Sequence, residues 1–259
     1  LRNLDKHVRN LRSFGQTAQT LDMVSSTKIR QHPQHVCTVE DSKILRNAVV
    51  YGANAAGKSN LIKALEVFVE VVRRGSLPQG LEQSFCRTEI ENEAKETTFD
   101  IQIEVDGRCY DYGFSAILSK RIVTGEWLYS VSRAGAKPLF ERKGRNIGLG
   151  IGLEEKALET RFQIYRDDFL DSDVCETSLF LSNVNSGRSF ALDSDLGFFQ
   201  QVYRWCMENV VMVGAGKPSP TCDFYLGSTL DEVSDLLASF DTGISRLEKR
   251  SMSFDELGK

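Results

Sequence analysis

The chain has 259 residues, of which 41% are hydrophobic and 26% are charged, and its net charge is -4 at pH 7. This is the composition of an ordinary globular protein, and its acidic balance argues against a nucleic-acid binder that is basic throughout. No apolar run approaches the ~20 residues of a membrane span, so we expect no membrane partner.

The first elements expected are the two strands of a hairpin within residues 8–24, where apolar and polar residues alternate. Residues 25–44 are polar and predict a surface loop. A buried strand is predicted at residues 45–51, which are mainly apolar. The helix that follows has apolar residues at intervals of three and four, and the Arg-Arg-Gly run at residues 73–75 forms its stop signal.

Between that strand and that helix, the sequence matches the P-loop pattern G-x-x-x-x-G-K-[ST]. Its glycines let the backbone turn so that N–H groups point at phosphate oxygens. Lys58 is expected to neutralise β- and γ-phosphate charge, and the Ser59 hydroxyl is expected to ligate Mg²⁺. The expected cofactors are therefore ATP and Mg²⁺. The loop residues expected to bind the nucleotide are Gly52, Ala53, Asn54, Ala55, Ala56, Gly57, Lys58 and Ser59.

A run of antiparallel strands is predicted after a Glu-rich loop at residues 76–96. Asp106-Gly107 is the expected hairpin turn between the first two strands. The meander has no crossover helices, so we expect a sheet separate from that of the P-loop strand. Its strands are predicted at residues 97–105, 110–118, 122–131 and 138–142.

The remainder is predicted to be largely helical. Aromatic residues on one stripe of the helix at 196–207 indicate core packing. Helices are predicted at 178–181, 196–207 and 230–240, and short strands at 209–213 and 243–247. The six cysteines form no Cys-x-x-Cys pair, and such scattered thiols favour a reducing, cytoplasmic location.

Residues 51–65 closely resemble the ABC-type ATPase heads of the RecF/OLD/SMC group, and within it the branch often called AAA-15 or AAA-21. Asn54 stands where those heads commonly carry asparagine. Their opening strand reads roughly N-F-[RK]-S-F, and residues 10–14 are similar to it, with leucine in place of phenylalanine. The pair Tyr110 and Tyr112 and the Glu-Trp at residues 126–127 resemble features of their antiparallel strands.

The resemblance implies an α/β fold in which an antiparallel β-lobe packs on a nucleotide-binding core, with a helical lobe beside it. The parts would be residues 1–75, with the P-loop; 76–150, the β-lobe; and 151–259, mainly helical. It also implies a head dimer formed with a second copy of the chain in the presence of ATP.

The resemblance assigns a role to Asn54, and the positions of Asn60 and Arg12 suggest roles for these two residues. Asn54 would reach toward the γ-phosphate or the attacking water. Asn60 either extends the binding loop or is a polar residue of the first helical turn. Arg12 either contacts phosphate or forms a surface salt bridge.

The basic run at residues 142–145 is either solvated loop charge or a local basic patch.

The sequence departs from the family in two motifs. A Walker B strand needs four apolar residues followed by Asp-Glu, and neither Asp231-Glu232 nor Asp255-Glu256 fits. An L-S-G-G-like signature is missing too. Both motifs belong to the C-terminal half of the family fold, so we expect that half to lie outside these residues, and the catalytic residues stay unknown.

Three functions are compatible with these observations. The first is an ATP-hydrolysing sensor or regulator in bacterial antiphage defence, which acts with a nuclease or toxin effector. The second is a DNA-repair head of the RecF type that clamps nucleic acid. The third is a pseudo-ATPase that binds nucleotide as a switch. The acidic charge favours the first over the second, because a DNA clamp needs many phosphate contacts.

Overall fold

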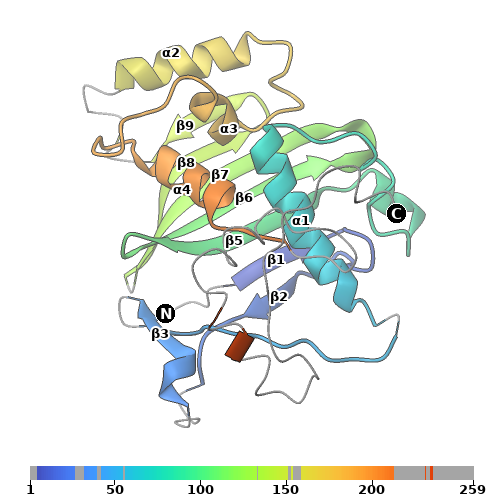
Figure 1. Ribbon diagram of the computed structural model, residues 1–259. Helices are drawn as coiled ribbons and strands as arrows, with labels where there is room; N and C mark the ends of the chain where they lie inside the picture. The colour runs from blue at the N-terminus through green and yellow to red at the C-terminus, as the bar shows by residue number, and fades with distance from the viewer. Residues whose placement is uncertain are drawn as a thin grey trace, which may run out of the picture. The chain divides into compact units, whose positions relative to one another are not determined.

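The computed structural model describes residues 5–26, 32–39, 42–54, 56–132, 134–150, 153, 159–212, 231 and 234–235 (Figure 1). The chain divides into two compact units, Leu1–Val210 and Val211–Lys259, and the elements below lie in the first. Described residues of the second unit at 231 and 234–235 are helical and fall within the helix predicted there. The strand predicted at 243–247 lies outside the described residues.

Within the described residues, seven antiparallel strands form one sheet in the order β2-β1-β5-β6-β7-β8-β9. The predicted meander and the antiparallel pairing of the first hairpin are thus confirmed, although β1 ends at Arg9 and so covers less of residues 8–24 than predicted, and β9 is an addition. The strands are β1 (Asp5–Arg9), β2 (Gln19–Asp22), β5 (Thr97–Val105), β6 (Arg108–Ile117), β7 (Ile122–Ser132), β8 (Gly135–Lys143) and β9 (Asn146–Leu149). The predicted Asp106-Gly107 turn is confirmed by φ angles of 51° and 78°.

A second, two-stranded sheet pairs β3 (Val36–Val39) with β4 (Ser42–Leu45) and follows the 3-10 turn η1 (Pro33–His35). The loop predicted over residues 25–44 is therefore wrong in its second half. The strands are short, with four residues each, and none of their described side chains is fully buried, so they lack the long alternating pattern of a core strand.

In Figure 1, α1 and α4 cross one face of the large sheet, and α2 contacts α3. The described helices are α1 (Lys58–Arg74), α2 (Glu159–Leu170), α3 (Phe180–Asn185) and α4 (Phe198–Glu208), with 3-10 turns η2 (Ile90–Glu93) and η3 (Leu118–Lys120). The predicted stop of α1 is confirmed, because Gly75 adopts φ 74° and donates its N–H to the Val71 carbonyl at 2.9 Å. None of the helices described is long and apolar enough to cross a membrane.

Arg73, near the end of α1, holds the end of α4. Its guanidinium donates to the carbonyls of Cys206 at 3.1 Å, Met207 at 3.1 Å and Val210 at 2.8 Å. The Cys206 and Met207 carbonyls belong to the last turn of α4, where carbonyls lack partners within the helix, and Val210 follows the helix. The strand predicted at 209–213 is wrong for its described residues, 209–212, which form no strand.

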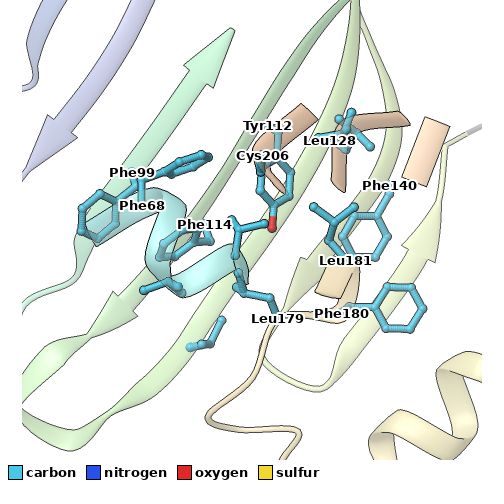
Figure 2. Packing of buried hydrophobic residues seen from close by; sticks show 14 of the residues in the cluster. Phe68, Phe99, Tyr112, Phe114, Leu128, Phe140, Leu179, Phe180, Leu181 and Cys206 are labelled. Atoms are coloured by element: carbon cyan, nitrogen blue, oxygen red, sulfur yellow. The ribbon is translucent and has the colours of Figure 1, made fainter. Parts of the chain in front are cut away.

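Aromatic side chains fill the space between the sheet and the helices (Figure 2). Phe68 of α1 stacks on Phe114 of β6, with ring centroids 5.7 Å apart. Farther along the sheet, Phe140 of β8 stacks on Phe180 of α3 at 5.2 Å and meets Phe199 of α4 edge-on at 5.2 Å. The aromatic stripe predicted as core in α4 is therefore confirmed.

A buried carboxylate joins the sheet to α3. Glu126 of β7 is 0% exposed and accepts the backbone N–H groups of Phe180 at 2.7 Å and Leu181 at 2.9 Å. The Tyr112 hydroxyl donates to the same carboxylate at 3.0 Å. Burial raises the pKa of Glu126, and the nearby Arg142 guanidinium and these donors offset part of that rise. The carboxylate thus takes the role of an N-terminal cap for α3.

Arg142 of β8 is also buried, at 3% exposure, so the expectation that it forms part of a solvated run or surface basic patch is wrong. Its Nη1 lies 3.8 Å from Oε2 of Glu126 and donates to the Ser178 carbonyl at 2.7 Å. It also donates to the Cys175 carbonyl. Burial lowers the pKa of Arg142. Because the two charged groups are not in close contact, each is held mainly by backbone groups at the start of α3.

We predict that Glu126→Gln lowers the free energy of unfolding by about 3 kcal/mol, because the amide keeps one acceptor and leaves buried donors unpaired. Urea denaturation at pH 7 measures the change. The matched control is Glu176→Gln, which makes the same chemical change at an exposed position and should shift stability by less than about 0.5 kcal/mol. Equal effects of the two substitutions would contradict the capping role.

Candidate nucleotide-binding site

The bend before α1 is shaped by a glycine and a lysine. Gly57 is the N-cap of α1 and has φ 90°, a left-handed conformation that favours glycine. Lys58 folds back, and its Nζ donates to the carbonyls of Gly52 at 2.6 Å and Ala53 at 2.7 Å. The backbone therefore curls around an ammonium group.

The start of α1 has the electrostatics of an anion site. No side chain caps it, and its first turn contains no acidic residue. The helix dipole and the leading N–H groups thus act together with the Lys58 ammonium. Asn54, Ala56 and Ser59 are exposed along this bend. Ala55 lies outside the described residues.

Residues 10–15 form a tight turn after β1 rather than the strand that the family resemblance implied. Asn10 and Arg12 adopt left-handed φ angles of 51° and 52°, which end the strand at Arg9. The Asn10 N–H donates to the Gly15 carbonyl at 2.9 Å. Leu11 and Phe14 exchange two backbone hydrogen bonds, of 3.0 Å and 2.8 Å, which close the turn.

Asn10 fixes this turn to the rest of the fold. Its side chain is 0% exposed and donates to the carbonyls of Asn92 at 2.8 Å and Lys95 at 3.0 Å. Its Oδ1 accepts the Cys86 N–H at 3.2 Å. Asparagine is one of the few residues that adopt left-handed φ readily. The sequence offers only that propensity as a signal, so pattern reasoning missed the role of Asn10.

The turn brings Ser13 against the start of α1. The Asn60 side chain donates to the Ser13 hydroxyl at 2.8 Å. A Cβ added at Gly57 would lie 3.2 Å from the same oxygen. Arg12 donates its N–H to the Ser84 carbonyl at 2.7 Å. In the part of the chain that the structure describes, the exposed Arg12 guanidinium forms no hydrogen bond or ion pair.

The buried strand predicted at residues 45–51 is wrong. Leu45 is the last residue of β4, and the following segment pairs with no described strand. Val49 is 69% exposed and Tyr51 is 87% exposed. Apolar composition predicts strand only when the backbone has a partner, and beyond Arg46, whose N–H donates to the His35 carbonyl at 2.8 Å, the segment pairs with no described strand.

An apolar groove of about 170 Å³ lies between this segment, α1 and the sheet. Ala48 and Val50 line one side, and Leu61 and Leu65 of α1 line another. Ile62, which also lines it, is 54% exposed. Apolar side chains of α1 thus border this groove in addition to the packed core.

Other candidate residues have structural roles or lie away from the P-loop. The Trp127 indole N–H donates to Asp100 at 3.0 Å on β5. Together with the capping role of Glu126, this places the Glu-Trp pair within the sheet. Among the described residues, no group of three or more His, Cys, Asp or Glu side chains is placed to hold a metal ion.

The bend has a glycine at each end, encloses the Lys58 ammonium and leads directly into a helix without a side-chain cap. These features define a P-loop domain of the nucleotide-binding class. Residues 48–189, more than half of the chain, match the family described as "AAA domain, putative AbiEii toxin, Type IV TA system". The chain therefore belongs to this family of P-loop ATPase-like domains. No curated protein matches the chain.

We predict that Asn10→Ala lowers the free energy of unfolding by about 3 kcal/mol, because it leaves a buried N–H and two carbonyls unpaired and strains a left-handed residue. Chemical denaturation measures the loss. Asn146→Ala, at an exposed position of β9, is the matched control and should cost less than about 0.5 kcal/mol. A similar small effect at both sites would contradict the anchoring role of Asn10.

Proposed function

We propose that the chain binds Mg²⁺-ATP at residues 52–59 and is the nucleotide-binding part of an ATPase. The observation that carries this proposal is the position of the Lys58 ammonium inside the bend, at the start of a helix without a cap or an acidic first turn. Lys58 now satisfies two carbonyls, and a triphosphate would offer it stronger, charged acceptors.

Each residue of the bend has a distinct role in this proposal. Backbone N–H groups of residues 53–59 hold phosphate oxygens, and Lys58 neutralises β- and γ-phosphate charge. Ser59 is exposed on the first turn of α1, where its hydroxyl oxygen suits a hard cation. When bound, Mg²⁺ neutralises developing charge on the phosphates. Asn54, also exposed, is the residue proposed to face the γ-phosphate or the attacking water.

Arg12 is proposed as a second cationic contact to phosphate. Its backbone is held in the left-handed region by the turn, and its neighbour Ser13 touches the start of α1. The exposed guanidinium has no ion-pair partner among the described residues, so contact with phosphate would break no recorded salt bridge.

The biological role proposed is that of an ABC-type ATPase subunit in bacterial antiphage defence. In this role the chain would form a head dimer with a second copy of itself and act with a nuclease or toxin effector. The description of the matched family, which names a toxin of a Type IV TA system, supports this role. The rival role of DNA clamp has weaker support. The chain is acidic overall, and Arg142 of its most basic run is buried in the fold.

We predict that Lys58→Ala weakens Mg²⁺-ATP binding at least about 30-fold, because it removes charge-assisted bonds to two phosphates. Titration calorimetry measures the dissociation constant, and circular dichroism checks folding. Lys63→Ala removes the same charge from an exposed position farther along α1 and should bind ATP like the wild type. Unchanged affinity in a folded Lys58→Ala protein would contradict the site.

We predict that Arg12→Ala weakens ATP binding about tenfold and ADP binding less, since ATP presents more phosphate charge to the guanidinium. Competition against a fluorescent nucleotide gives both constants. Arg87→Ala is the control, because Arg87 is exposed and bonds only to Gln83 among the described residues. Equal ATP affinity in the wild type and Arg12→Ala would contradict a contact between Arg12 and phosphate.

A further inference from the structure

The structure contains one polar side-chain link between the start of α1 and the turn after β1. The donor is Asn60, one residue beyond the Mg²⁺-ligand candidate Ser59, and the acceptor is the hydroxyl of Ser13, 47 residues away in the sequence. We infer that Ser13 is a positioning residue of the nucleotide site, which fixes the first turn of α1 and the bend before it. This inference rests on the proposed nucleotide binding.

Ser13 also lies beside the bend at Gly57. Its hydroxyl lies 3.2 Å from the position that a Cβ on Gly57 would occupy. Gly57, at φ 90°, is the residue where the bend becomes helix. One hydroxyl therefore accepts a hydrogen bond from Asn60, the third helical residue, and lies where a side chain at position 57 would approach it. Movement of α1 relative to the turn would break the hydrogen bond, because its length allows little variation.

The turn that carries Ser13 is fixed by many contacts, which makes it a suitable support. Leu11 is 0% exposed and pairs with Phe14 through two backbone bonds. The Arg12 N–H is bound by the Ser84 carbonyl at 2.7 Å. The Asn10 side chain makes three hydrogen bonds to the segment that precedes β5. The turn therefore connects the large sheet to the candidate phosphate site and holds the two in a fixed arrangement.

The hydrogen bond gives Asn60 a structural role that does not depend on phosphate. Its side-chain N–H₂ group donates to Ser13, so in this inference Asn60 acts by holding the first turn of α1 in place. A support of this kind reduces the conformational entropy that the bend loses when it binds an anion. The smaller entropy loss increases the affinity for nucleotide. Ser13 is exposed and Asn60 is half-buried, so global stability should depend little on the pair.

The test is a double-mutant cycle on the whole chain with Ser13→Ala, Asn60→Ala and the double variant. The probe is a methylanthraniloyl ATP analogue with Mg²⁺, and its dissociation constant is measured by fluorescence. We expect each single variant to bind the probe about three- to tenfold more weakly. The double variant should be no weaker than the worse single variant, because both substitutions remove the same bond.

A second readout does not depend on nucleotide. Amide hydrogen exchange of peptides that cover residues 56–62 should be faster in Ser13→Ala than in the wild type, without ligand present. Ser13→Thr keeps the hydroxyl and should restore slow exchange and wild-type affinity. Ser119→Ala, which removes a hydroxyl bonded to the Glu93 carbonyl at 2.7 Å, is the control and should change neither quantity.

The outcomes separate this inference from the proposed function. If the wild type binds the probe and Lys58→Ala does not, the nucleotide site stands. Unchanged affinity and exchange in Ser13→Ala would then overturn the positioning role alone, as would losses that multiply in the double variant. If the wild type fails to bind the probe, the proposed function fails, whereas the exchange measurement still reports on the link.

Discussion

The left-handed conformation of Gly57 is the constraint on which the candidate site depends. It turns the chain from the bend directly into α1, so that the leading N–H groups of the helix and the Lys58 ammonium share one small space. A residue with a side chain would be strained at this φ and would also approach the Ser13 hydroxyl. Glycine at position 57 therefore suits the backbone conformation and also leaves room for the Ser13 hydroxyl of the turn after β1.

The large sheet gives this bend a fixed base. One face of α1 packs on the sheet through Phe68 and its neighbours, and Arg73 ties the far end of α1 to the end of α4. The buried pair Glu126 and Arg142 fixes the start of α3 in the same layer. Polar groups in this core bind backbone groups more closely than they bind each other, which gives them a structural rather than a catalytic role.

Local signals predicted much of this fold. Period-two alternation located β5 and β6, Asp106-Gly107 located their turn, and Gly75 located the end of α1. The strand at 45–51 was predicted wrongly, because apolar composition does not reveal whether a backbone partner exists. The roles of Asn10 and Ser13 depend on contacts with segments far along the chain, and a sequence pattern carries no information on such contacts. The P-loop bend itself was predictable, because backbone geometry and anion chemistry restrict its residues so tightly.

The most direct test of the central claim is calorimetric titration of ATP into the wild-type chain, first with Mg²⁺ and then with the cation chelated. The account predicts saturable binding of one nucleotide per chain that weakens when Mg²⁺ is removed, because Ser59 and the phosphates would then lose their shared cation. An absence of saturable binding in the presence of Mg²⁺, from a protein shown to be folded, would contradict it.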